Sequence, residues 1–374
     1  MPELKAVSCP FCSLHCADLH LHFDGDRLVQ VSPACSMAQK MYSVALDALA
    51  ASKNLSSDRE ISQAVAWTRE SSHKMVILCG DLHQEAVECA VQFARRQKAT
   101  LVCEEDFTGS SLSLAMKQAG LISATLGELK KAVQQIICCT KDVHNSLPRI
   151  ADFLGQQLIN QAVYLSSEHA LDAIRRMRLK QETLPDELLE IQNKIQAVEC
   201  GLLLFDRDWL EGDHQIAAEL LLWLGELNIE KRWYGLAIPP AANSFGVVES
   251  LLSLTGYPGN MRFQSDGVKY EPRTCTLSWL LQNAHIDLCY FLGTPHFLTE
   301  KMLDLSGEIP TLVLGPNPPE GKNAVWLPAA LAGIDCAGSS LRLDGLPVVF
   351  QPVSTSHRHP IEDVLRKING EVTV

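Results

Sequence analysis

The chain has 374 residues, of which 47% are hydrophobic and 20% are charged, and it carries a formal net charge of −12. This composition excludes the disordered, collagen-like and low-complexity classes. The acidic balance argues against nucleic acid as a partner, because phosphate binding requires a dense cationic surface. No apolar run reaches the roughly 18 residues that a membrane span needs, and the first residues do not resemble a secretory signal. We therefore expect a cytoplasmic protein without a membrane partner, whose thirteen cysteines are reduced thiols or metal ligands.

The first fifty residues predict a small antiparallel unit. Residues 19–23 and 28–31 alternate apolar and polar side chains on either side of Asp24-Gly25-Asp26, which is typical of a β-hairpin. Helix-forming residues follow from about 36 to 52. We expect a β-rich, cysteine-rich domain over residues 1–55.

Beyond residue 56, short apolar runs alternate with amphipathic segments. The expected strands are 75–78, 99–103, 135–139, 201–205, 287–292, 311–314 and 324–327, and the expected helices are 84–97, 112–119, 186–198, 213–227 and 277–284. Such alternation predicts parallel sheets covered by helices on both faces. We expect two interleaved, doubly wound α/β domains: a discontinuous one over 56–125 and 280–374, and a second over 126–279. We predict no helix and no complete strand in the Gly-, Pro- and Asn-rich stretch from about 235 to 272.

The strongest local motif is Cys9-Pro-Phe-Cys12-Ser-Leu-His-Cys16, followed by Cys35 beyond the hairpin. Thiolates are soft ligands, and three packed this closely can hold three corners of an iron–sulfur cube that a distant fourth completes. Structural zinc more often uses two separated pairs of cysteines. The alternative is four buried thiols, or a ligand set that is now empty. We predict a metal site at Cys9, Cys12, Cys16 and Cys35, with a 4Fe–4S cluster as the candidate cofactor.

The remaining motifs are weaker. His15, His20 and His22 are either spare ligands or histidines on a polar hairpin face. The segment 80–83 lies at a strand-to-helix turn, where ligands often bind in α/β sheets, although such turns are commonly caps. The pair Cys138–Cys139 is typical of buried strand thiols.

The N-terminal cysteine pattern resembles the molybdopterin oxidoreductase superfamily, whose large subunits begin with a small cluster-binding domain. Three further segments narrow the resemblance to the B subunit of formylmethanofuran dehydrogenase. Residues 241–246 carry its Asn–Gly pair, 254–258 its Thr-Gly-Tyr-Pro, and 267–272 its Gly…Tyr-x-Pro, in that order. Residues 126–130 and 287–295 also resemble that family, so the resemblance covers most of the chain.

The resemblance also implies losses. The family's catalytic subunit places a Cys-His dipeptide after the second strand of its first α/β block, where the Cys ligates tungsten or molybdenum. Matching residues 99–115 to that segment puts Thr108 and Gly109 at the dipeptide. A threonine hydroxyl is a harder and weaker ligand than a thiolate. Cys103 lies five positions earlier and would take the role only in a shifted alignment.

Two more family features are missing. The position of the catalytic Arg holds Ser265 or Asp266, and the nearest cation, Lys269, lacks a guanidinium's bidentate fork. The family's strand end Gly-Cys-Asn-Pro, which grips a pterin guanine dinucleotide, corresponds to residues 138–142. These have neither Gly nor Pro, so the backbone cannot approach a phosphate as closely. We expect no catalytic residue and no molybdenum or tungsten pterin in this chain.

In the family's aerobic branch, a subunit of this type occurs in a bacterial formyltransferase/hydrolase complex of formaldehyde oxidation. That complex moves a formyl group from tetrahydromethanopterin to a methanofuran-like carrier and releases formate. The resemblance therefore implies a non-catalytic, structural subunit whose partners are a metallohydrolase, a formyltransferase and a further subunit. One alternative is a catalytic tungsten or molybdenum subunit of formylmethanofuran dehydrogenase that uses Cys103. Another is a stand-alone electron carrier, against which the long α/β body argues.

Overall fold

The computed structural model describes residues 3–51, 58–104, 110–179, 183–210, 213–294, 309–319 and 323–372. The chain divides into two compact units. Unit 1 comprises residues 1–108, 241–341 and 347–374, and unit 2 comprises residues 109–240 and 342–346. Each unit contains a parallel sheet with helices on it, so the predicted fold class of interleaved α/β units after a small antiparallel sheet is confirmed. None of the helices in the described ranges combines the length and apolar character of a membrane crossing.

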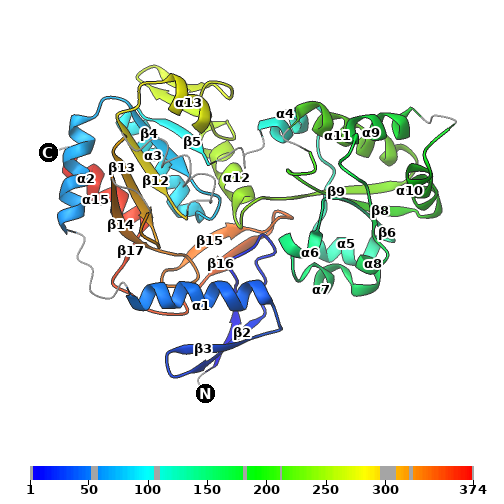
Figure 1. Cartoon of the computed structure of the whole chain (residues 1–374), viewed down its shortest axis with the longest axis horizontal. Helices are drawn as coiled ribbons and strands as arrows, with labels where there is room; N and C mark the ends of the chain where they lie inside the picture. The colour runs from blue at the N-terminus through cyan, green and yellow to red at the C-terminus, as the bar shows by residue number, and fades with distance from the viewer. Residues whose placement is uncertain are drawn as a thin grey trace. The chain divides into compact units, whose positions relative to one another are not determined.

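Unit 1 begins with the predicted hairpin. Strands β1 (Glu3–Val7), β2 (Leu19–Asp24) and β3 (Arg27–Ser32) form an antiparallel sheet in that order. Gly25 lies in the turn with φ +60°, a conformation that glycine adopts without the strain of a side chain. Helix α1 (Ser36–Ala51) follows β3 (Figure 1).

The main sheet of unit 1 has eight strands in the order β11-β10-β5-β4-β12-β13-β14-β17. Their bounds are β4 (Lys74–Leu78), β5 (Thr100–Cys103), β10 (Met261–Gln264), β11 (Gly267–Tyr270), β12 (Leu288–Leu292), β13 (Thr311–Gly315), β14 (Ala324–Ala330) and β17 (His359–Pro360). The strands from β5 to β17 are parallel, and β10 and β11 add an antiparallel hairpin beside β5. The strand order reverses between β4 and β12, and ligands of doubly wound sheets bind beyond the carboxyl ends of the strands at such a point.

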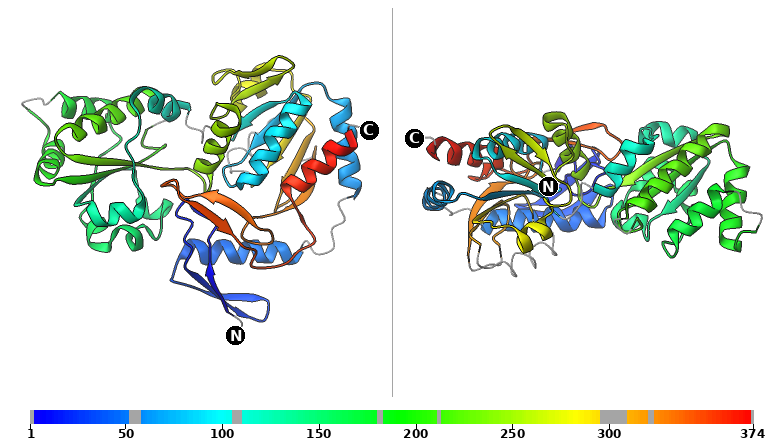
Figure 2. Two further views of the ribbon diagram at one scale, coloured as in Figure 1. Left: turned by 180° about the vertical axis from the view of Figure 1, so that it is seen from behind. Right: turned by 90° about the horizontal axis from the view of Figure 1, so that it is seen from above.

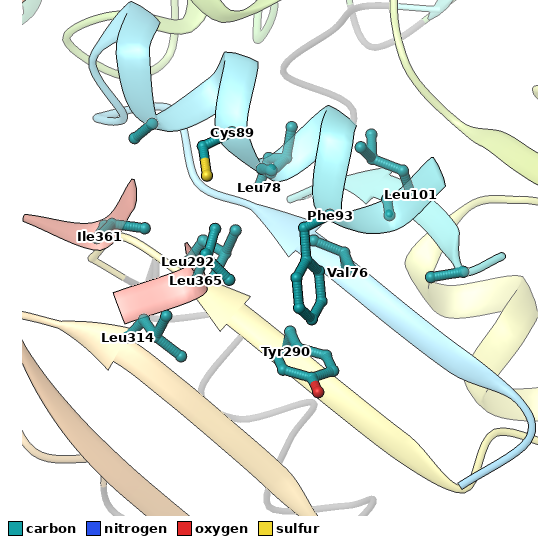
Figure 3. Packing of buried hydrophobic residues seen from close by; sticks show 14 of the residues in the cluster. Val76, Leu78, Cys89, Phe93, Leu101, Tyr290, Leu292, Leu314, Ile361 and Leu365 are labelled. Atoms are coloured by element: carbon teal, nitrogen blue, oxygen red, sulfur yellow. The ribbon is translucent and has the colours of Figure 1, made fainter. Parts of the chain in front are cut away.

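Helices cover both faces of this sheet. On one face lie α2 (Asp58–Glu70), α3 (Gln84–Gln97), α12 (Ser244–Thr255) and α15 (Ile361–Val372), and on the other lies α13 (Leu277–Asn283). Figure 2 shows α3 and α15 in front of the strands. Alternate residues of β4 enter the two cores, Val76 on the α3 side and Met75 on the α13 side, which explains its continuous apolar sequence. On the α3 side, Phe93 meets Tyr290 edge to face at 4.9 Å between ring centroids (Figure 3).

Unit 2 has a four-stranded parallel sheet in the order β7-β6-β8-β9. The strands are β6 (Gln135–Cys139), β7 (Val163–Tyr164), β8 (Cys200–Asp206) and β9 (Arg232–Ile238). The helices are α4 (Ser110–Ala119), α5 (Leu126–Ala132), α6 (Val143–Ser146), α7 (Ile150–Leu154), α8 (Gln156–Asn160), α9 (Ala170–Arg178), α10 (Asp186–Ala197) and α11 (His214–Glu230). The basic residues of α9 form ion pairs, Arg175 with Glu219 and Arg178 with Glu226.

The structure divides the chain at positions that differ from those expected. Residues 241–279 lie in unit 1 rather than in the second α/β domain, because β10 pairs with β5 and α12 packs on α3. Residues 110–125 lie in unit 2, where α4 packs on α11. The Gly-rich stretch 235–272 is largely regular, since it contains part of β9 and all of α12, β10 and β11. A last hairpin in unit 1 pairs β15 (Gly338–Leu341) with β16 (Pro347–Phe350).

Candidate functional site

The four predicted cysteine ligands come together beside the N-terminal sheet. The loop between β1 and β2 closes on itself, because the backbone N–H of Cys9 donates to the carbonyl of Cys16 at 2.8 Å and that of His15 donates to the carbonyl of Cys12 at 3.0 Å. Burial raises the pKa of the Cys9 thiol, and the negative charges of Cys12, Cys16 and Cys35 raise it further. Cys12, Cys16 and Cys35 therefore all lie near enough to Cys9 to affect its ionisation.

Cys35 occupies the start of helix α1. Its Sγ accepts the backbone N–H of Ala38 at 3.5 Å, and its carbonyl accepts that of Gln39 at 2.9 Å. The positive end of a helix stabilises a thiolate and lowers the cost of ionising a cysteine. This position therefore favours Cys35 as a metal ligand.

His15 is buried, with 2% of its surface exposed, and lies among the cysteines with φ +40°. Its Nδ1 donates to the carbonyl of Cys9 at 3.1 Å, and its Nε2 is 2.7 Å from Oγ of Ser340. Oγ of Ser340 also donates to Oδ1 of Asn243 at 2.5 Å, so the serine connects His15 to Asn243. These bonds fix the imidazole ring of His15 beside the cysteine loop.

Asn243, from the Asn–Gly pair, ties three segments of unit 1 together. Its backbone N–H donates to the carbonyl of Gly80 at 2.7 Å, its Nδ2 donates to the carbonyl of Leu82, and its Oδ1 also accepts the N–H of Leu341 at 3.2 Å. Gly246 makes room for this side chain, since a Cβ there would collide with the amide of Asn243. The motif therefore has a structural role: it joins the start of α12 to the turn after β4 and to β15.

At the carboxyl edge of the main sheet, Asp81 and Cys79 pack against Gly293, which follows β12. Both carboxylate oxygens of Asp81 accept the backbone N–H of Thr294 at 3.1 Å. Gly293 has φ +102°, and a Cβ there would lie 2.5 Å from Oδ1 of Asp81 and 2.8 Å from Cβ of Cys79. The glycine is required by this internal packing, so it does not by itself indicate an open cradle for a cofactor.

Cys79 and Cys103 are buried at the same edge. Burial, followed by the charges of Glu104 and Asp81, raises the pKa of the Cys79 thiol well above its ordinary range. Cys103 ends β5 with 3% of its surface exposed, and its backbone N–H donates to Oδ1 of Asn260 at 3.3 Å. Carboxyl groups beside a thiol disfavour the thiolate form that binds metal. The predicted positions Thr108 and Gly109 lie outside the described residues.

The positions matched to the family's catalytic Arg lie at the other edge of the sheet. Ser265 and Asp266 form the exposed turn between β10 and β11. Because β10 runs antiparallel to β5, this turn lies toward the amino ends of the parallel strands. Lys269 is exposed on β11, the edge strand. The carboxyl edge beside Asp81 therefore contains none of these three side chains, Ser265, Asp266 and Lys269.

In unit 2, Cys138 and Cys139 are fully buried in β6, which confirms the prediction of buried strand thiols. Burial raises the pKa of Cys138 to about 12. The polar groups that follow bond to their neighbours: Oγ1 of Thr140 donates to Asp206, and Asp142 caps α6. Local hydrogen bonds therefore explain the polar residues that follow β6.

The other histidines of the N-terminal hairpin bond within the three-stranded N-terminal sheet. Nδ1 of His20 is 2.9 Å from Oε1 of Glu3, and Nε2 of His22 is 3.1 Å from Oγ of Ser32. Their local partners support the interpretation of hairpin-face histidines over that of spare ligands.

Comparison with known proteins finds relatives that align with nearly the whole chain. No protein-family profile matches it. It is 19% identical to the B subunit of the tungsten-containing formylmethanofuran dehydrogenase 2 of Methanocaldococcus jannaschii, over 94% of this chain and 93% of the relative. The corresponding subunit of Methanococcus maripaludis is 18% identical, over 94% of each chain. The chain resembles the B subunit of formylmethanofuran dehydrogenase throughout its length.

The fold also matches a solved structure. One chain in the X-ray structure of the formyltransferase/hydrolase complex (FhcABCD) of Methylorubrum extorquens with methylofuran aligns with a TM-score of 0.70. The alignment covers 86% of this chain and 97% of that one, at 14% identity. The chain therefore resembles the dehydrogenase B subunit in sequence and one chain of this complex in fold.

The cysteine donors fit an iron–sulfur cluster better than a single ion. Thiolates bound to one tetrahedral zinc ion at 2.3 Å lie roughly 3.8 Å apart. Within the described ranges, the groups of three ligand atoms that all lie within 4.8 Å of one another do not include these sulfurs. Four thiols with the helix end at Cys35 fit the chemistry of an iron–sulfur cluster, whose irons take cysteine thiolates as ligands.

Proposed function

We propose that this chain is a non-catalytic, structural subunit of a formyltransferase/hydrolase complex in tetrahydromethanopterin-dependent one-carbon metabolism, derived from the B subunit of formylmethanofuran dehydrogenase. Full-length resemblance to that subunit and the shared fold support the derivation. The packing at the carboxyl edge of unit 1 carries the non-catalytic part of the proposal. There, Asp81 and Cys79 fill the space beside Gly293, and the carboxyl groups of Asp81 and Glu104 lie beside the Cys79 thiol.

The proposed cofactor is a 4Fe–4S cluster held by Cys9, Cys12, Cys16 and Cys35. Its role is structural, because ligation would join the β1–β2 loop to the start of α1. The closed loop and the helix end at Cys35 support this assignment. No molybdenum or tungsten pterin is proposed.

The proposed partners are a metallohydrolase, a formyltransferase and a further subunit, and the chain stabilises their assembly by contacting the metallohydrolase. The support is the multi-subunit nature of the structural neighbour, which is described as a formyltransferase/hydrolase complex. The proposal places the formyl-transfer and hydrolysis reactions on those partners.

The test is purification of the tagged full-length chain from its own cells without oxygen. Mass spectrometry counts the co-purifying subunits, and elemental analysis counts iron, molybdenum and tungsten. We expect the formyltransferase and metallohydrolase to co-purify with the chain, about four iron atoms per chain, and molybdenum and tungsten far below one per chain. A chain that purifies without these partners contradicts the proposed assembly.

The second candidate is the catalytic tungsten or molybdenum subunit, which the position of Cys103 at the carboxyl end of β5 favours. It predicts one tungsten or molybdenum atom per chain, lost in the variant Cys103→Ala. That result would replace the structural proposal with the catalytic one.

A further inference from the structure

Three potential metal ligands converge at the amino end of the unit 1 sheet, at the opposite edge from Asp81. His73 comes just before β4, and His285 and Asp287 come just before β12. Their ligand atoms all lie within 4.8 Å of one another, and Nδ1 of His73 is 3.8 Å from Oδ2 of Asp287. The two imidazole rings meet edge to face, 5.6 Å between centroids. Two neighbouring strand starts thus direct three donors to one place.

The backbone holds the carboxylate of Asp287 in position. Its Oδ1 accepts the N–H of His73 at 2.8 Å, and its Oδ2 accepts the N–H of Ser72 at 3.0 Å. The N–H of Asp287 in turn donates to the carbonyl of His73 at 3.0 Å. Each carboxylate oxygen has a second lone pair, so these bonds orient the group and leave it able to coordinate an ion.

The donor set selects the class of ion. Two imidazoles and one carboxylate suit zinc and its neighbours among the transition metals, whereas calcium and magnesium prefer oxygen ligands alone. Ligands of a tetrahedral zinc ion at about 2.1 Å lie roughly 3.4 Å apart. The separation of 3.8 Å between His73 and Asp287 therefore needs only a small side-chain adjustment. As a solvent-exposed pair alone, the two side chains would contribute little to stability.

We propose that His73, His285 and Asp287 form a binding site for a divalent transition-metal ion of the zinc class. Both histidines line an open pocket of about 930 Å³, which gives the ion access from solvent. Three protein ligands leave the fourth position to a water molecule. The bound ion joins the starts of β4 and β12, two adjacent strands that lie on either side of unit 2 in the sequence. This site is independent of the proposed function and of the four cysteines.

The experiment titrates the full-length protein with Zn²⁺ and Co²⁺ after dialysis against a chelator. Wild type is compared with His285→Ala and with the control His357→Ala, which removes an exposed histidine elsewhere in unit 1. We expect wild type and the control to bind one more zinc ion per chain than His285→Ala, and zinc to raise their melting temperature further. The Co²⁺ difference spectrum between wild type and His285→Ala should show visible ligand-field bands without a sulfur-to-cobalt band.

His73→Ala provides a second variant, which should lose the same zinc ion. Equal zinc stoichiometry and affinity in wild type, His285→Ala and His73→Ala would overturn the proposal. A sulfur-to-cobalt band in the difference spectrum would also overturn it, because the lost ion would then belong to cysteines. Circular dichroism confirms that each variant retains the fold before binding is compared.

Discussion

The cysteine loop and the carboxyl edge of the unit 1 sheet both bury thiols, yet different groups surround the thiols in the two places. Beside Cys9 lie His15 and the other three cysteines of the set, and Cys35 lies at the first N–H groups of α1. Beside Cys79 lie the carboxylates of Asp81 and Glu104. Burial raises the pKa of Cys9 and of Cys79 alike, so burial does not distinguish the two places. The comparison teaches that the groups gathered around a buried cysteine, and not burial alone, distinguish a candidate metal site.

The largest effect that tests this contrast is loss of iron. Cys12→Ala removes one half-buried thiolate from the loop, and we expect the iron content to fall from about four atoms per chain to below one, with loss of visible absorbance. Cys103→Ala is the matched control, since it removes a thiol from the carboxyl edge and should leave the iron content unchanged. Elemental analysis of anaerobically purified protein measures both. Retention of iron by Cys12→Ala would contradict the ligand assignment.

Next in size is the cost of adding a methyl group at the carboxyl edge. Gly293→Ala places a Cβ against Asp81 and Cys79 in a left-handed conformation, and we expect the free energy of unfolding to fall by about 2–4 kcal/mol. Gly127→Ala in α5 is the control, because it meets no neighbour and sits in a helix, where alanine stabilises by about 0.5–1 kcal/mol. Urea denaturation measures both. A neutral Gly293→Ala would mean that this edge is open enough to receive a ligand.

A smaller effect is expected where the cysteine loop joins the rest of unit 1. Ser340→Ala leaves Nε2 of His15 and Oδ1 of Asn243 short of a buried partner, so the free energy of unfolding should fall by about 1–3 kcal/mol. Ser339→Ala is the control, since that serine bonds to Gln84 and Glu85 on a more exposed face. If chemical denaturation gives both variants the same free energy of unfolding, the hydrogen bonds from Ser340 to His15 and Asn243 add no more stability than those of Ser339.

Local sequence patterns were sufficient to predict most of the helices and strands around these two groups of thiols. The helix predicted over 84–97 and the strand over 135–139 coincide with α3 and β6, because amphipathic and apolar periodicities act within a few residues. The helix α12 was missed, because the Asn, Gly and Pro around it are typical of loops. Its start is held by Asn243 bonding to Gly80 and Leu82, which lie far away in the sequence.

The candidate sites show the same limit. The cysteine spacing suggested a ligand set from residues 9–35 alone, and that set remains a prediction. The position of His15 beside it depends on Ser340, 325 positions away, so no spacing rule identifies the histidine as a buried donor. The sequence also gives no sign of the group formed by His73, His285 and Asp287. Its members come together only when β4 and β12 pair. Contacts between distant segments are fixed by the completed sheet, and a single sequence does not record them.

The smallest expected effect is at the pair that fastens the turn after β4 to α15. Nε2 of His83 lies 3.0 Å from Oε2 of Glu362, and both side chains are largely buried. Burial alone would raise the pKa of Glu362, but the hydrogen bond and charge of His83 outweigh it and hold the pKa below its ordinary value. A carboxyl group whose pKa is lower in the folded state stabilises the protein at pH values above the unfolded pKa of about 4.3. This contribution is lost as the pH falls through the folded pKa.

Glu362→Gln should therefore reduce the free energy of unfolding by about 1 kcal/mol at pH 7, and the difference from wild type should shrink between pH 5 and 3. Glu88→Gln, on the exposed face of α3, is the control and should be nearly neutral throughout. Denaturant titrations at several pH values provide the measurement. A difference that stays constant with pH would show that Glu362 acts through packing and not through its charge, and the carboxyl edge would then be closed by contacts alone.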